Sequence, residues 1–137
     1  SCQKDGLLSI SQHAMRFHGR LAYHEYEGIA IDLEERRRLA SDLGDAPAML
    51  LRNHGSLTVG STAGEALNQL YYLERACQIQ IAALSGNAEL HFPQPEVAAK
   101  TAAQWQKLVR DPKYIGAFWD ACLQLVETEH EASGAMQ

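Results

Sequence analysis

The sequence predicts an α/β layered domain that ends in a helical tail. Three observations lead to this prediction: residues that favour extended structure gather in the first third, an amphipathic helical pattern follows from position 62, and only helical patterns occur after position 95. The 137 residues, 46% apolar and 21% charged, fit one domain with a real core. Strands mixed with helices, followed by helices alone, indicate layers with the tail packed outside.

The first elements that we expect are strands near residues 20–26 and 28–31, within a stretch over 9–32 whose composition favours extended structure. A short helix should follow over 34–43, because acidic residues occupy its first turn and Gly44 stands just beyond its end. The arginine triplet inside this helix is typical of a solvated face.

A second pair of strands is predicted in the middle of the chain. Residues 47–52 form an apolar run typical of a buried strand, residues 53–55 end it abruptly, and residues 57–60 form another short strand. The pattern therefore places a histidine, His54, in the corner between two strands.

Three helices are expected in the remainder. Thr62 and Glu65 match a capping box, which opens a long amphipathic helix that residues 85–87 end. A further helix is predicted over 95–109, and the Asp-Pro pair at 111–112 separates it from a last helix. We expect the whole chain, 1–137, to be a single domain.

Charge and composition limit the partners. Seventeen acidic and 12 basic residues give a formal charge of −5 without a dense basic stripe, so we expect no nucleic-acid partner. No apolar run is long enough to span a membrane, and no signal peptide is recognisable, so we expect a cytoplasmic protein with no membrane partner. The widely spaced Cys2, Cys77 and Cys122 are predicted to be buried, reduced thiols.

His54 is the candidate functional residue, because a strand-end corner holds an imidazole rigidly and leaves one ring nitrogen facing a cleft. A metal ion or a general base would use such a ring. A zinc site needs further ligands, and the chain offers neither HxH nor HxxxH spacing. Surface or supporting roles are expected for the other five histidines, and the common catalytic motifs are missing, so the catalytic residues stay unassigned.

The sequence resembles the class II aldolase/adducin family, and its adducin-like bacterial branch in particular. The resemblance rests on AYHEYEGI at 22–29, on LLRNHGSLTVG at 50–60, and on two supporting segments, QKDGLLSIS at 3–11 and ERACQIQI at 74–81. These segments occur in the right order and at the right separations over residues 1 to about 87, and the resemblance fades beyond residue 90. We therefore divide the domain into a core over 1–87 and a helical tail over 88–137.

The resemblance implies a fold and a metal site. Members of the family fold as a three-layer α/β/α sandwich with a mostly antiparallel sheet, and the enzymes use a divalent metal, commonly zinc, held by three histidines. His54 corresponds to the third of these ligands. Tyr26 corresponds to an aromatic residue that lines the site of a neighbouring subunit, and a half-buried position in a strand is the competing explanation for it. The family enzymes are commonly tetramers, so a homo-oligomer is expected.

The other ligands of the family site lie upstream of where this chain starts. By this resemblance the chain is the C-terminal portion of a larger protein, incomplete at its N-terminal side, inactive alone and dependent on an upstream half. The parent protein would act on a small sugar or sugar phosphate by enediolate-stabilising carbon–carbon cleavage, with epimerisation and decarboxylation left open. Two alternatives remain: a non-catalytic adducin-like interaction domain, and a truncated inactive fragment. An unpaired sheet edge predicts self-association.

Overall fold

The described chain combines helices with a small sheet, as expected of an α/β fold. The computed structural model describes residues 1–29 and 33–134, with residues 129–134 described by their backbone alone. No helix in these ranges is long and apolar enough to cross a membrane. The elements, in order, are α1 (Gln12–Met15), β1 (Leu21–His24), α2 (Leu33–Leu43), β2 (Ala48–Leu51), β3 (Gly55–Thr58), α3 (Ala63–Ser85), α4 (Pro95–Val109) and α5 (Pro112–Gly134).

The three strands form one small sheet with the order β1-β2-β3. β1 and β2 run parallel, with Tyr23 opposite Leu50, because the chain crosses over through α2 between them. β2 and β3 run antiparallel and pair Leu51 with Gly55. The described strands thus make one parallel and one antiparallel pair, so they do not by themselves confirm a mostly antiparallel sheet.

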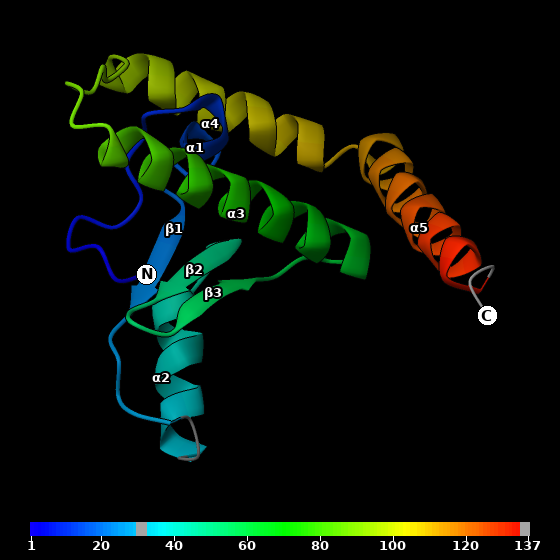
Figure 1. The fold of residues 1–137 in the computed structure, drawn as a ribbon. Coiled ribbons are helices and arrows are strands. Elements are labelled where there is room, and N and C mark those ends of the chain that lie inside the picture. Colours follow the sequence, from blue (N-terminus) through cyan, green and yellow to red (C-terminus); the bar gives the residue numbers. More distant parts are fainter. Residues whose placement is uncertain (30–32, 135–137) are drawn as a thin grey trace.

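The two faces of the sheet are covered by different helices, because side chains alternate along a strand. Tyr23 lies on the face where Leu50 and Leu73 form the apolar core with Phe17 and Ala48. His24 points to the opposite face, where α2 packs. Figure 1 shows α2 on one side of the sheet and α3, with α4 beyond it, on the other.

Helix α3 begins and is anchored as its sequence predicts. The Thr62 hydroxyl accepts a hydrogen bond from the Glu65 amide at 3.1 Å, and the Glu65 carboxylate accepts one from the Ser61 amide at 2.8 Å. These contacts satisfy amides that a helix start leaves unpaired. The Thr62 half of the predicted capping box is therefore confirmed, whereas the Glu65 carboxylate bonds the amide of Ser61, one residue before the cap.

Near its other end, α3 is joined to the N-terminal segment through Gln80. The Gln80 amide nitrogen donates to Gln3 Oε1 at 2.6 Å and to the Gly6 carbonyl at 2.8 Å, while Gln80 Oε1 accepts from the Leu8 amide at 2.6 Å. The side chain of Gln80 is buried, so these three bonds satisfy the polar atoms of its amide group.

The first third of the chain is less extended than its composition predicts. Residues Gln12–Met15 form the short helix α1, because the Ser11 hydroxyl accepts from the Ala14 amide at 3.1 Å and caps it. The strand predicted over 20–26 covers only Leu21–His24. The strand predicted over 28–31 is wrong where it can be checked, since residues 28 and 29 form a bend; residues 30 and 31 lie outside the described residues.

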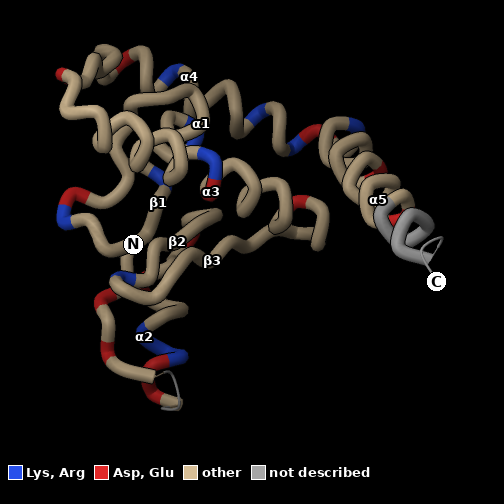
Figure 2. The backbone as a smooth tube through the Cα atoms, viewed as in Figure 1, with Lys and Arg blue, Asp and Glu red and all other residues tan. Residues whose placement is uncertain are grey.

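The predicted helices are present, and α4 matches its predicted range. Figure 2 shows acidic and basic positions close together along α2, where Arg37 donates to Glu34 at 3.0 Å. The arginine triplet at 36–38 is exposed, which confirms its prediction as a solvated face. The prediction of three buried thiols is wrong for Cys2, which is exposed, and Cys77 and Cys122 are only partly buried.

Candidate functional site

His54 lies in the corner between β2 and β3, as the sequence predicts. Asn53 has φ 57°, a left-handed conformation that asparagine tolerates better than most residues, and it turns the chain sharply. The His54 amide donates to the Leu51 carbonyl at 3.1 Å and closes this turn. The backbone of His54 is therefore fixed while its side chain is exposed to solvent.

The imidazole of His54 borders a small cavity of about 30 Å³. The cavity lies between the strand corner, α2 and the segment that follows β1. Titratable and aromatic side chains from these three segments line it. Its lining residues are His24, Glu25, Tyr26, Glu27, Glu35, Leu39, Leu51, Arg52 and His54. The structure thus brings together the two residues singled out from the sequence, His54 and Tyr26.

Tyr26 lies beyond the end of β1, and 55% of its surface is exposed. The explanation of Tyr26 as a half-buried tyrosine within a strand is therefore wrong. An exposed aromatic ring at the edge of this cavity is free to contact a molecule bound there.

A buried histidine forms the floor of the same region. His24 is 5% exposed, and its Nδ1 donates to Asp42 Oδ2 at 2.7 Å. Its Nε2 has no hydrogen-bond partner among the described residues, although Glu27 Oε1 and Glu35 Oε1 lie 3.8 and 4.0 Å away. A surface or supporting role was expected for His24. The surface position is wrong, because the ring is buried and surrounded by three carboxylates, while the supporting role stays a prediction.

Glu35 and Asp42 were not predicted from the sequence as neighbours of the candidate site. A signal for them existed, since Glu35, Leu39 and Asp42 follow helical spacing and therefore share one face of α2. The structure directs this face toward His24. The helix face that carries Leu39 is the one expected to pack on the sheet, and this expectation would have predicted the position of both acids.

The corner offers one metal ligand rather than a complete metal site. The His54 ring makes no hydrogen bond or ion pair with any residue that the structure describes, so one nitrogen is available. Among those residues, however, no three histidine, cysteine or carboxylate side chains are grouped so as to hold a metal ion. A structural zinc ion needs about four ligands and a catalytic one about three from protein. Any metal at His54 needs further ligands from outside the described residues.

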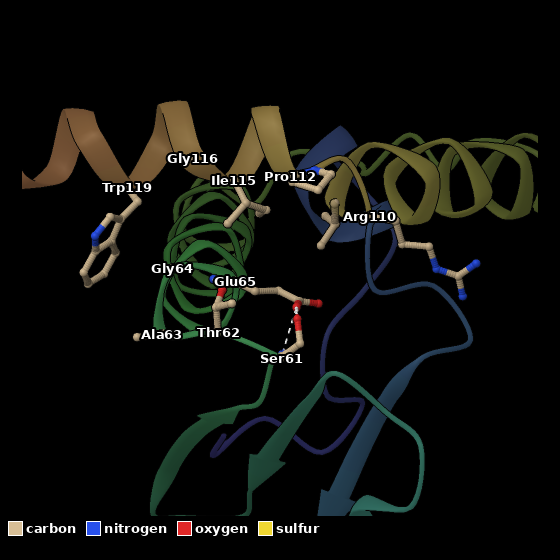
Figure 3. A pocket seen from close by; sticks show the side chains of 11 residues that line it. Ser61, Thr62, Ala63, Gly64, Glu65, Arg110, Pro112, Ile115, Gly116 and Trp119 are labelled. Carbon is tan, nitrogen blue, oxygen red and sulfur yellow. Dashed lines mark hydrogen bonds between the residues drawn. The ribbon is translucent and has the colours of Figure 1, made fainter.

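A second cavity, of about 750 Å³, lies far from these residues in the fold, between the start of α3 and the junction of α4 with α5 (Figure 3). Apolar groups of Ile115 and Trp119 form one side of it. Its carboxylate, Glu65, is already bonded to Ser61. This cavity has the size of a ligand pocket but lacks a cluster of reactive groups among the residues described.

The family comparison agrees with the resemblance drawn from the strand and corner motifs. Residues 1–81 match the family described as Class II Aldolase and Adducin N-terminal domain. A "Putative aldolase class 2 protein" of Caulobacter vibrioides is 42% identical over 129 residues, which are 94% of this chain and 50% of that protein. Alpha-adducin of Rattus norvegicus is 41% identical over 86 residues, or 62% of this chain and 12% of that protein. The chain spans half the length or less of these curated relatives.

Two solved structures have a similar fold. An aldolase II superfamily protein from Pseudomonas syringae superimposes with a TM-score of 0.86 and 53% identity, over 93% of this chain and 51% of that one. L-fuculose 1-phosphate aldolase from Glaciozyma antarctica superimposes with a TM-score of 0.61 and 26% identity, over 82% and 43% of the two chains. The similarity to both structures and to the Caulobacter protein continues into the helical tail, beyond the residues that carry the motifs.

Proposed function

Because this chain belongs to the class II aldolase and adducin family, we propose that it forms part of a metal-dependent aldolase-like protein that acts on a small sugar or sugar phosphate. The observation that carries the proposal is the exposed, unbonded imidazole of His54 in a rigid strand corner of the described chain. The similarity to a sugar-phosphate aldolase supports the choice of substrate class.

The metal requirement follows from what one imidazole can do. His54 offers one neutral nitrogen, and the remaining ligands are proposed to come from outside these 137 residues, as the half-length match to the relatives suggests. A divalent ion, which we propose to be zinc, would act there as a Lewis acid and stabilise the enediolate formed by carbon–carbon cleavage. We propose that a further sheet and helices complete a three-layer sandwich and that the assembled protein is a cytoplasmic homo-oligomer.

The residues around His54 would shape the site. The exposed ring of Tyr26 offers an apolar face with a hydroxyl, which suits contact with a polyhydroxylated substrate. Arg52 stacks on Tyr23, with its guanidinium 4.5 Å from the ring centre, and donates to the Gln3 carbonyl at 2.8 Å. It therefore rigidifies the strand end that carries His54.

The test replaces His54 in the full-length polypeptide that contains this chain. We expect His54→Ala to lose bound metal, measured by elemental mass spectrometry, together with cleavage of sugar phosphates in a coupled assay. His91→Ala removes an exposed histidine elsewhere and is the matched control. Unchanged metal content and cleavage in His54→Ala would refute the assignment of His54.

A non-catalytic adducin-like interaction domain is the second candidate. The 41% identity to alpha-adducin, close to the 42% identity to the putative aldolase of Caulobacter vibrioides, supports this alternative. It predicts that the full-length protein binds no stoichiometric metal and cleaves no sugar phosphate while remaining folded. The same measurements therefore separate the two candidates. A folded protein that binds no metal, cleaves no sugar phosphate and binds no partner would support the remaining alternative, a truncated inactive fragment.

A further inference from the structure

Three arginines from separate elements converge on a cavity of about 60 Å³ on the face of the sheet opposite α2. Arg16 ends α1, Arg20 precedes β1, and Arg110 ends α4. Glu65, Gln69 and Trp105 also line the cavity. None of the residues around His54 takes part, so the cavity is independent of the proposed metal site.

Arg16 is the deepest of the three and has no carboxylate partner among the described residues. It is 2% exposed, and its guanidinium carbon lies 4.5 and 4.9 Å from the ring centres of Tyr72 and Trp105. Its Nε donates to Gln69 Oε1 at 3.0 Å and its Nη2 to Asn68 Oδ1 at 2.6 Å. Both acceptors are neutral amides, and within the same part of the chain Nη1 has no hydrogen-bond partner. A buried, unneutralised guanidinium is costly.

The pKa of Arg16 reflects this cost. Burial lowers the pKa of Arg16 below its ordinary value, and the hydroxyl of Tyr114 nearby offsets part of the effect. Burial, followed by the charge of Arg110, lowers the pKa of Arg20. Arg20 is therefore close enough to Arg16 and to Arg110 for their charges to repel it.

One carboxylate, that of Glu65, borders the cavity with the three guanidinium groups, so the positive charges outnumber the negative one there. Arg16, Arg20 and Arg110 form no ion pair with any carboxylate of the described residues. Glu65 borders the cavity, but its Oε2 accepts hydrogen bonds from the amide and the hydroxyl of Ser61, at 2.8 and 2.5 Å. The cavity thus has a local excess of positive charge in a chain whose net charge is −5.

We propose that this cavity binds a small oxyanion, either free phosphate or the phosphoryl group of a small phosphomonoester. A tetrahedral oxyanion matches a cavity of this size, and guanidinium groups bind phosphate oxygens through paired, charge-assisted hydrogen bonds. The anion would offset the repulsion that Arg20 experiences from Arg16 and from Arg110. Trp105 borders the cavity and stacks near Arg16, so its fluorescence should report binding.

Inorganic phosphate is the first probe. The chain is titrated with phosphate at constant ionic strength, and binding is followed by tryptophan fluorescence and by calorimetry. We expect saturable binding that weakens roughly tenfold in Arg110→Gln and in Arg20→Gln, as expected from the loss of one charge-assisted contact. The Arg110 side chain is exposed and the Arg20 side chain is half-buried, so both variants should fold, which circular dichroism verifies.

Arg75→Gln is the matched control, because it removes one positive charge from the exposed side of α3, where Arg75 stacks on Tyr71. It should bind phosphate like the wild type. Absence of saturable binding, or equal weakening in all three variants, would overturn the proposal. Competition with glycerol 3-phosphate separates the two ligand sources: displacement of phosphate identifies a phosphomonoester, and failure to displace it identifies the free ion.

Discussion

His24 Nδ1 lies 2.7 Å from Asp42 Oδ2, and this contact joins the last residue of β1 to the last turn of α2. His24 is buried, whereas the Asp42 side chain is 45% exposed. The contact therefore lies at the border between the sheet and solvent, and it fixes the end of α2 next to the cavity that His54 also borders.

Replacing Asp42 with asparagine should destabilise the fold. The amide side chain would keep the shape of the carboxylate but lose the charge-assisted bond to His24. Because Asp42 is partly exposed, we expect a loss of about 1 kcal/mol in the free energy of unfolding. Urea unfolding at neutral pH measures this loss. Asp45→Asn, at an exposed carboxylate in the following turn, is the control. Identical midpoints for the two variants would show that the contact is energetically negligible.

Position 53 should tolerate glycine but not valine. Asn53 has φ 57°, which a β-branched residue adopts only with strain, so Asn53→Val should cost about 1–2 kcal/mol of stability. Asn53→Gly should change stability by only about a few tenths of a kcal/mol. Thermal unfolding of both variants compares them. If valine were as stable as glycine, the left-handed turn before His54 would not be required.

The three thiols should react at different rates. Burial, followed by the charge of Glu74, raises the pKa of the Cys77 thiol above its ordinary value, so a smaller fraction of Cys77 is thiolate at mildly alkaline pH. The exposed Cys2 should therefore be alkylated first and Cys77 more slowly, with the labelling of Cys77 increasing as the pH rises. Peptide mass spectrometry after timed iodoacetamide treatment gives the order. In urea the difference should vanish, and equal rates in the folded chain would contradict the expectation.

The isolated chain should self-associate. Among the described strands, β1 and β3 each have a partner on one side only, and such edges can pair with other chains. Apolar side chains such as Ile81, Leu125 and Val126 are more than half exposed, which adds surface for association. Light scattering at micromolar concentration should detect dimers or larger species. A single monomeric species across the concentration range would be incompatible with this expectation.

Much of the fold follows from local sequence patterns. The Thr62 cap before α3 and the helical range of α4 depend on contacts within a few residues, and both appear as predicted. The corner at His54 was likewise predictable, because an apolar run followed by Asn53 and Gly55 leaves little choice but a turn.

The features that were missed depend on contacts distant in sequence. The helix α1 was obscured because the apolar residues that follow it, such as Phe17, also suit a strand, whereas the Ser11 cap favours a turn of helix. The environment of His24 depends on packing against α2, which one strand sequence cannot reveal. The buried Arg16 lies among side chains from α3 and α4, so no local motif marks it.

The bonds made by Gln80 join segments separated by as many as 77 positions. Such contacts can form only after the intervening chain has come together, because loop closure over that distance costs entropy before any contact compensates for it. The first eight residues should thus acquire order late in folding, in concert with the final turns of α3. A shortened protein that lacks the first eight residues would leave the buried side-chain amide of Gln80 without these hydrogen-bond partners.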